Sequence, residues 1–98
     1  MGFLSRSPGT KTAKEIEILN KLGLHARPCA KFVKLANCFR SEVWVAKDDD
    51  KVNGKSIMGL MMLAAGIGSK LMITCEGSDS EQALAALEKL ILSKFDED

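Results

Sequence analysis

The spacing of apolar residues changes several times over short distances, and this restricts the fold more than any other feature of the sequence. Residues 13–20 alternate apolar and acidic side chains, with Ile16 and Ile18 on one face, as in a half-buried strand. Residues 26–38 repeat apolar side chains every three or four positions, as along one face of a helix: Cys29, Phe32, Val33 and Ala36. This succession indicates a mixed fold of strands and helices.

The rest of the chain continues the mixed pattern. Apolar and β-branched runs predict strands over 42–47, 51–53 and 71–76, and a short helix over 57–63. Ser78 and Glu81 match a capping box, which predicts a last helix to about Phe95. Its core-facing residues should be Ala83, Leu84, Leu87, Leu90 and Ile91. The order β-α-β-β-α-β-α favours an α+β fold with an antiparallel or mixed sheet and the helices on one face.

Length and composition narrow the class of protein further. A chain of 98 residues has room for one domain, and a net charge of +1 argues against a nucleic-acid partner. The longest apolar stretch, 57–67, is too short to cross a membrane, and residues 1–12 lack the apolar region of a signal peptide. We therefore expect a flexible leader over 1–12, one domain over 13–98, no membrane insertion and a cytoplasmic location.

The three cysteines fit a reducing compartment. Cys29, Cys38 and Cys75 form no CxxC pair and are odd in number, so reduced thiols are expected. His25 and Cys29 are four residues apart and could share a helix face toward a metal ion. No second pair has ligand spacing, so structural thiols are the better interpretation. We expect no metal and no cofactor.

His25 is the only histidine and stands directly before a helix whose first turn contains Arg27 and Pro28. The N-terminus of a helix offers unpaired N–H groups and a partial positive charge, which suit a phosphate group. The alternative is a capping or packing histidine without a chemical role. Its place between Gly23 and Pro28 predicts a surface position, which favours a phosphoryl acceptor.

The helix over 57–63 is apolar nearly all round, more than a chain of this size can bury. We expect Leu60, Leu63 and Ala64 in the core. Ile57, Met58 and Met61 should form an exposed patch for a protein partner, here called the docking patch.

Ser56 directly precedes this helix and is expected to be its N-cap. A phosphate on Ser56 would add about −1.5 to −2 charges beside the docking patch and repel an apolar partner. Ser56 is thus a candidate regulatory phosphorylation site. The Gly54-Lys55-Ser56 sequence is not a P-loop, since Asp49 stands where the motif requires glycine.

Residues 23–28 (GLHARP) and 53–60 (NGKSIMGL) resemble the two motifs of HPr, the histidine-containing phosphocarrier family of the bacterial phosphoenolpyruvate-dependent phosphotransferase system. The resemblance covers about residues 13–95. It implies an open-faced β-sandwich with four antiparallel strands and three helices. It also implies that enzyme I phosphorylates His25 on Nδ1, that Arg27 is the active-site arginine, and that an HPr kinase/phosphorylase modifies Ser56.

The function expected from this resemblance is phosphoryl transfer from enzyme I through His25 to IIA components of sugar uptake. The alternative is a mainly regulatory carrier, kinase-switched or of the nitrogen type, that signals to protein partners such as a transcriptional regulator. A third hypothesis is a small binding module with an incidental histidine. The chain is expected to be a monomeric, stoichiometric carrier rather than a complete enzyme.

Overall fold

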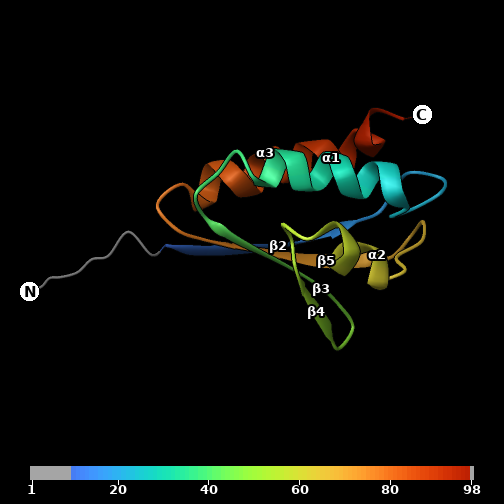
Figure 1. Cartoon of the computed structure of the whole chain (residues 1–98), viewed down its shortest axis with the longest axis horizontal. Coiled ribbons are helices and arrows are strands. Elements are labelled where there is room, and N and C mark those ends of the chain that lie inside the picture. The colour runs from blue at the N-terminus through green and yellow to red at the C-terminus, as the bar shows by residue number, and fades with distance from the viewer. Residues whose placement is uncertain (1–9, 98) are drawn as a thin grey trace, which may run out of the picture.

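The computed structural model describes residues 10–97, shown in Figure 1. The strands and helices follow the expected order, with one added 3-10 turn, η1, at the C-terminal end. In chain order the elements are β2 (Lys11–Glu17), α1 (Ala26–Ala36), β3 (Glu42–Lys47), β4 (Asp50–Asn53), α2 (Ile57–Met62), β5 (Lys70–Glu76), α3 (Ser80–Leu92) and η1 (Lys94–Asp96).

The four strands form one antiparallel sheet in the order β2-β5-β3-β4. The first strand therefore pairs with the last, where Ile16 lies opposite Leu71, and β5 pairs in turn with β3, where Val45 lies opposite Ile73. This topology decides between the antiparallel and mixed sheets that the pattern allowed.

The two long helices, α1 and α3, lie side by side over one face of the sheet (Figure 1). Successive side chains of a strand point to opposite faces, so Val43 and Val45 face the helices and are fully buried. Glu15, Trp44 and Met72 point to the other face, which no helix of the described residues covers. The α+β class with an open-faced sheet is confirmed.

The ends of several elements differ from the expected ones. β2 begins at Lys11, inside the segment expected to be a leader, while residues 1–9 lie outside the described part of the chain. The regular strand ends at Glu17, although Ile18 continues the pairing through its N–H to the carbonyl of Ser69. α1 ends at Ala36, two residues early, where Asn37 becomes the C-cap.

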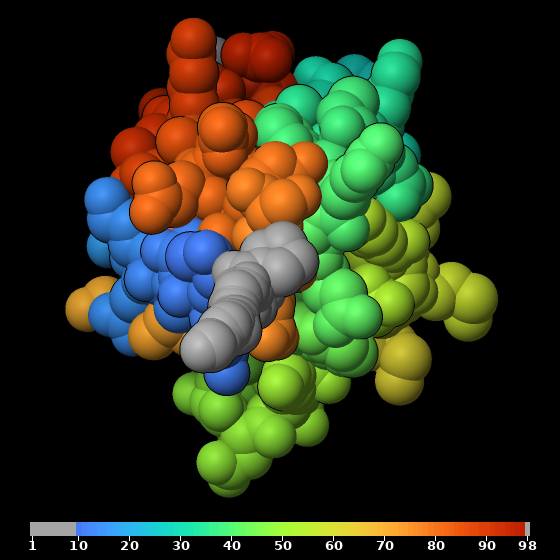
Figure 2. All heavy atoms as spheres, turned by 90° about the vertical axis from the view of Figure 1, so that its left-hand side faces the viewer, coloured from blue at the N-terminus to red at the C-terminus, as the bar shows by residue number. Residues whose placement is uncertain are grey.

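The expected capping box at Ser78 is wrong. The N-cap of α3 is Asp79, and its carboxylate does not cap the helix. It accepts hydrogen bonds from the N–H groups of Arg40 and Ser41, at 2.9 and 3.0 Å, and from the Ser41 hydroxyl at 2.5 Å. Figure 2 shows this end of the molecule, where the start of α3 (orange) lies against the segment before β3 (green). A tertiary contact therefore displaced the local cap.

Two core assignments also need correction. Ala64 is exposed and has a left-handed φ of 50°, because the chain turns directly after α2. Ala65 takes the buried position instead, while Leu60 and Leu63 are buried as expected. On α3, Leu90 is only partly buried, and the other four expected core residues are fully or nearly fully buried. In residues 10–97, no helix has the length and apolar character needed to cross a membrane.

Candidate functional site

The loop that leads into α1 fixes the position of His25. Gly23 has a φ of +67°, and a side chain there would lie 2.4 Å from the carbonyl oxygen of Ala65, so only glycine fits. The N–H of Leu24 donates to that same carbonyl at 2.8 Å. The loop before His25 is therefore clamped against the loop after α2.

His25 is the N-cap residue of α1, with extended backbone angles. Its carbonyl accepts the first helical hydrogen bond, from the N–H of Cys29 at 3.1 Å, but its side chain makes no capping bond. The N–H groups of Ala26 and Arg27 have no acceptor within the helix, as at any helix N-terminus. The imidazole is 36% exposed, so an incoming group can reach the ring.

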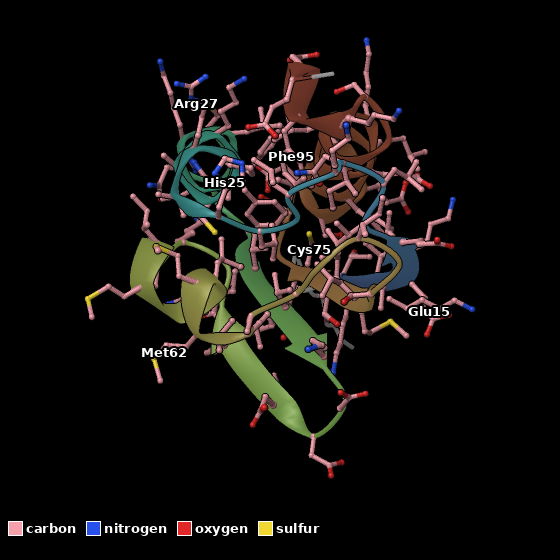
Figure 3. The ribbon with its side chains drawn as sticks, turned by 90° about the vertical axis from the view of Figure 1, so that its right-hand side faces the viewer. Glu15, His25, Arg27, Met62, Cys75 and Phe95 are labelled. Carbon is pink, nitrogen blue, oxygen red and sulfur yellow. The ribbon has the colours of Figure 1, made fainter. Side chains whose placement is uncertain are left out.

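His25 and Arg27 line one open pocket, of about 590 Å³, at the N-terminal end of α1. The other residues around it are Leu22, Ala26, Lys31, Asp96 and Glu97. Figure 3 looks onto this end of the molecule, with His25 and Arg27 at the start of α1 and Phe95 from the C-terminal segment beside them. The pocket brings together the two residues that the sequence predicted and a basic partner, Lys31.

Glu97 is a site residue that the sequence analysis missed. Its Oε2 and Oε1 atoms lie 3.2 and 3.4 Å from His25 Nε2. Its side chain is only 14% exposed, and Oε1 also accepts from Asn20 Nδ2 at 3.2 Å. A charged residue near the end of a chain carries no sequence signal for such a contact, because 72 residues separate the partners.

The C-terminal segment is held at the site by two anchors. Phe95 is fully buried, and its carbonyl accepts a hydrogen bond from Lys31 Nζ at 2.7 Å. Lys94, Phe95 and Asp96 all have left-handed φ angles between 56° and 60°. Such angles are costly for residues other than glycine, so tertiary contacts must hold this turn in place.

Ser56 and the docking patch lie on α2, outside the pocket lined by His25. Ser56 is the N-cap of α2, as expected, and its hydroxyl accepts from the N–H of Gly59 at 3.0 Å. The docking patch is exposed in all three members, Ile57, Met58 and Met61. Met62, which was not assigned to it, is 78% exposed and points away from the body of the protein in Figure 3.

Cys29 belongs to the core and not to the site. It is fully buried on α1, and its thiol lies 3.7 Å from the carbonyl oxygen of Leu24. Burial raises the pKa of the Cys29 thiol to about 11, which keeps it protonated and unreactive near neutral pH.

An accessible imidazole at a helix N-terminus, next to an arginine and on a small open-faced sandwich, defines the class of phosphoryl carriers. His25 and Arg27 lie together at the surface, in one open pocket. The chain belongs to the HPr family of the phosphotransferase system: the family model "PTS HPr component phosphorylation site" matches residues 12–93.

Individual relatives agree with the family assignment. The chain is 55% identical over 84 residues to the phosphocarrier protein HPr of Neisseria meningitidis, covering 86% of this chain and 94% of that protein. It is 39% identical to the phosphocarrier protein NPr of Shewanella violacea, covering 90% and 97% of the two chains. The crystal structure of HPr from Thermoanaerobacter tengcongensis superposes with a TM-score of 0.86 at 52% identity, covering 89% and 98%.

Proposed function

We propose that His25 accepts a phosphoryl group from enzyme I and passes it to IIA components of sugar uptake, in the cytoplasm. The observation that carries this proposal is the position of His25: an exposed ring at the N-cap of α1, beside Arg27. Family membership supports the pathway, because the matching model describes a phosphorylation site of an HPr component.

The surroundings of His25 suit a group that must be held and then given away. The free N–H groups of Ala26 and Arg27 and the guanidinium of Arg27 can meet the charge of a phosphoryl group on the ring. Each partly exposed contact of this kind is worth about 0.3–2 kcal/mol. Together they orient the group without trapping it. The protein acts as a stoichiometric carrier whose chemistry partners complete.

The test is incubation with enzyme I and labelled phosphoenolpyruvate, for the wild type and for His25→Ala. We expect acid-labile label on the wild type and none on the variant, since His25 is the only histidine of the chain. Ser56→Ala serves as the control and should be labelled normally. Equal labelling of His25→Ala would overturn the proposal.

Ser56 is proposed as a regulatory phosphorylation site that weakens docking. It is only partly buried and directly precedes Ile57 and Met58 of the docking patch, so a phosphate there adds negative charge beside apolar surface. Incubation with ATP and an HPr kinase should label the wild type but not Ser56→Ala. Phosphorylated protein should then accept the phosphoryl group from enzyme I more slowly, and an unchanged rate would contradict the switch.

A mainly regulatory carrier is the second candidate, and the partial exposure of Ser56 beside the docking patch is the observation that favours it. The identity of 55% to a protein named HPr, against 39% to one named NPr, favours the transport role. The two roles are separated by offering the phosphorylated protein to sugar-type and nitrogen-type IIA proteins in one mixture. Preferential transfer to the sugar type supports the first role.

A further inference from the structure

We propose that Glu97 is a positioning residue that holds the ring proton of His25 on Nε2 and so presents Nδ1 as the nucleophile. This inference deepens the proposed function and rests on it. It follows from the contact between the His25 ring and the Glu97 carboxylate, at 3.2 and 3.4 Å, and from how each of the two groups is held.

The carboxylate is fixed from its far side. Asn20 is fully buried, and its Nδ2 atom donates to Glu97 Oε1 at 3.2 Å and to the Gly23 carbonyl at 2.8 Å. The same asparagine therefore ties Glu97 to the loop that positions His25. With 14% of its side chain exposed, Glu97 has little freedom to turn toward water.

The chemistry of the two groups sets the position of the proton. An ionised carboxylate can only accept hydrogen bonds, so the ring nitrogen facing Glu97 must carry the hydrogen. A neutral imidazole has one N–H, which leaves the lone pair on the other nitrogen. A hydrogen on Nε2 therefore makes Nδ1 the nucleophile.

This arrangement lets the transfer proceed without moving a ring proton. The Nδ1 lone pair forms the bond to phosphorus, and the bond from phosphorus to the donor breaks, its electron pair staying with the donor. The ring then carries hydrogen on Nε2 and the phosphoryl group on Nδ1, with one positive charge on the imidazole. Glu97 faces that charge directly, and passing the group to an acceptor reverses the same bond changes.

The other charged residues around the pocket form no hydrogen bond or ion pair with the His25 ring in the described part of the chain. Lys31 is engaged by the Phe95 carbonyl, and Arg27 lies in the first turn of α1, near the free amides. Asp96 is exposed and makes no contact with the ring among the described residues. Of the two acidic residues that line the pocket, Glu97 alone touches His25.

The contact depends on a turn that the chain would not form by itself. Three successive left-handed residues, Lys94, Phe95 and Asp96, reverse the chain after α3 and bring Glu97 back to His25. Burial of Phe95 and the bond from Lys31 offset the cost of that backbone. Strain that tertiary contacts maintain beside a reactive group is typical of functional sites.

The direct test is the tautomer of His25 in the unphosphorylated protein, measured from the ¹⁵N shifts of both ring nitrogens. We expect the neutral His25 ring of the wild type to carry its hydrogen almost entirely on Nε2. In Glu97→Ala the share of the Nδ1–H form should rise roughly three- to tenfold, as the loss of one hydrogen bond implies. Asp49→Asn removes a negative charge from the exposed turn between β3 and β4, outside the pocket that His25 lines, and should match the wild type.

The second measurement is the rate of phosphoryl transfer from enzyme I to the same variants. Glu97→Ala should be slowed roughly three- to tenfold, and Asp49→Asn should not. A tautomer share unchanged in Glu97→Ala overturns the proposal, as does an unchanged transfer rate. The tautomer is measured without any phosphoryl donor, so this failure is distinct from labelling of His25→Ala, which would overturn the carrier function itself.

Discussion

At the scale of single residues, the environment of a side chain decides its chemistry more than its type does. The three cysteines show this clearly. Cys29 and Cys75 are buried in the core, and burial raises the pKa of each thiol to about 11. Cys38 is exposed just beyond the end of α1. Thiolate, and not thiol, is the reactive form, so the three residues should differ in reactivity.

We therefore expect iodoacetamide, near neutral pH and without denaturant, to alkylate Cys38 and spare Cys29 and Cys75. Peptide mass spectrometry locates the label. Cys38→Ser should give an unlabelled native protein, and denaturant should restore labelling at the other two positions. Rapid modification of Cys29 in the folded wild type would show that the core at α1 opens readily.

Sequence reasoning could predict that two side chains lie close together where they are close along the chain. His25 and Arg27 stand at the start of one helix, so their spacing predicted that they are neighbours, and the structure shows that they line one pocket. The contact of Glu97 with His25 was not predicted, because it depends on the reversal of the chain after α3 and on a buried asparagine in another loop. No local pattern records such a contact.

At the scale of secondary-structure elements, one carboxylate joins the start of α3 to the segment before β3. Hydrogen bonds from the Ser41 hydroxyl and then from the Arg40 N–H lower the pKa of Asp79 from its ordinary value. In the unfolded chain this carboxyl has its ordinary pKa, about 3.9. Asp79 therefore stabilises the fold fully above that pH, and the contribution is lost as the pH falls through the lower value of the folded state.

Asp79→Asn should accordingly lower the Tm near neutral pH, since an amide cannot accept all three hydrogen bonds in the same way. The difference in Tm from the wild type should shrink below about pH 4. Thermal unfolding followed by circular dichroism at a series of pH values measures this difference in Tm. Asp49→Asn, in the exposed turn between β3 and β4, is the control. A difference in Tm between Asp79→Asn and the wild type that does not depend on pH would exclude the ionised Asp79 carboxylate as the cause.

The existence and order of the elements were predictable, while several of their ends were not. Apolar spacing is a property of each segment, so the strands and α-helices of residues 10–97 were predicted, whereas the 3-10 turn η1 was not. The ends depend on contacts with other segments. Ser78 fits a capping pattern, yet the helix begins at Ser80 because Asp79 bonds to Ser41. Ala64 fits the helical spacing, yet the chain has already turned there.

At the scale of the whole molecule, two surfaces expose methionine to a similar degree. Met61 of the docking patch is 43% exposed on α2, and Met72 is 41% exposed on the open face of the sheet. The proposed function needs apolar surface on α2 but not on the open face. Substitutions at Met61 and Met72 therefore compare the contribution of the two surfaces to partner binding at similar exposure.

Met61→Asp should slow phosphoryl transfer from enzyme I by roughly tenfold, because a buried charge without a partner is costly at an interface. Met72→Asp should leave the rate within about twofold of the wild type. Steady-state transfer kinetics at several carrier concentrations compare the two variants. Equal loss in both variants would argue against the docking patch as the site of contact.

The open face of the sheet also decides what an optical probe can detect. Trp44, the single tryptophan, stands on that face with the ammonium of Lys51 5.1 Å from its ring centre, whereas His25 caps a helix on the covered face. The fluorescence emission of Trp44 should change when the β3–β4 hairpin unfolds. It should change little when the ring of His25 is modified. Fluorescence titrations of this protein would then measure the integrity of the scaffold, and a reporter of its phosphorylation would have to be introduced elsewhere.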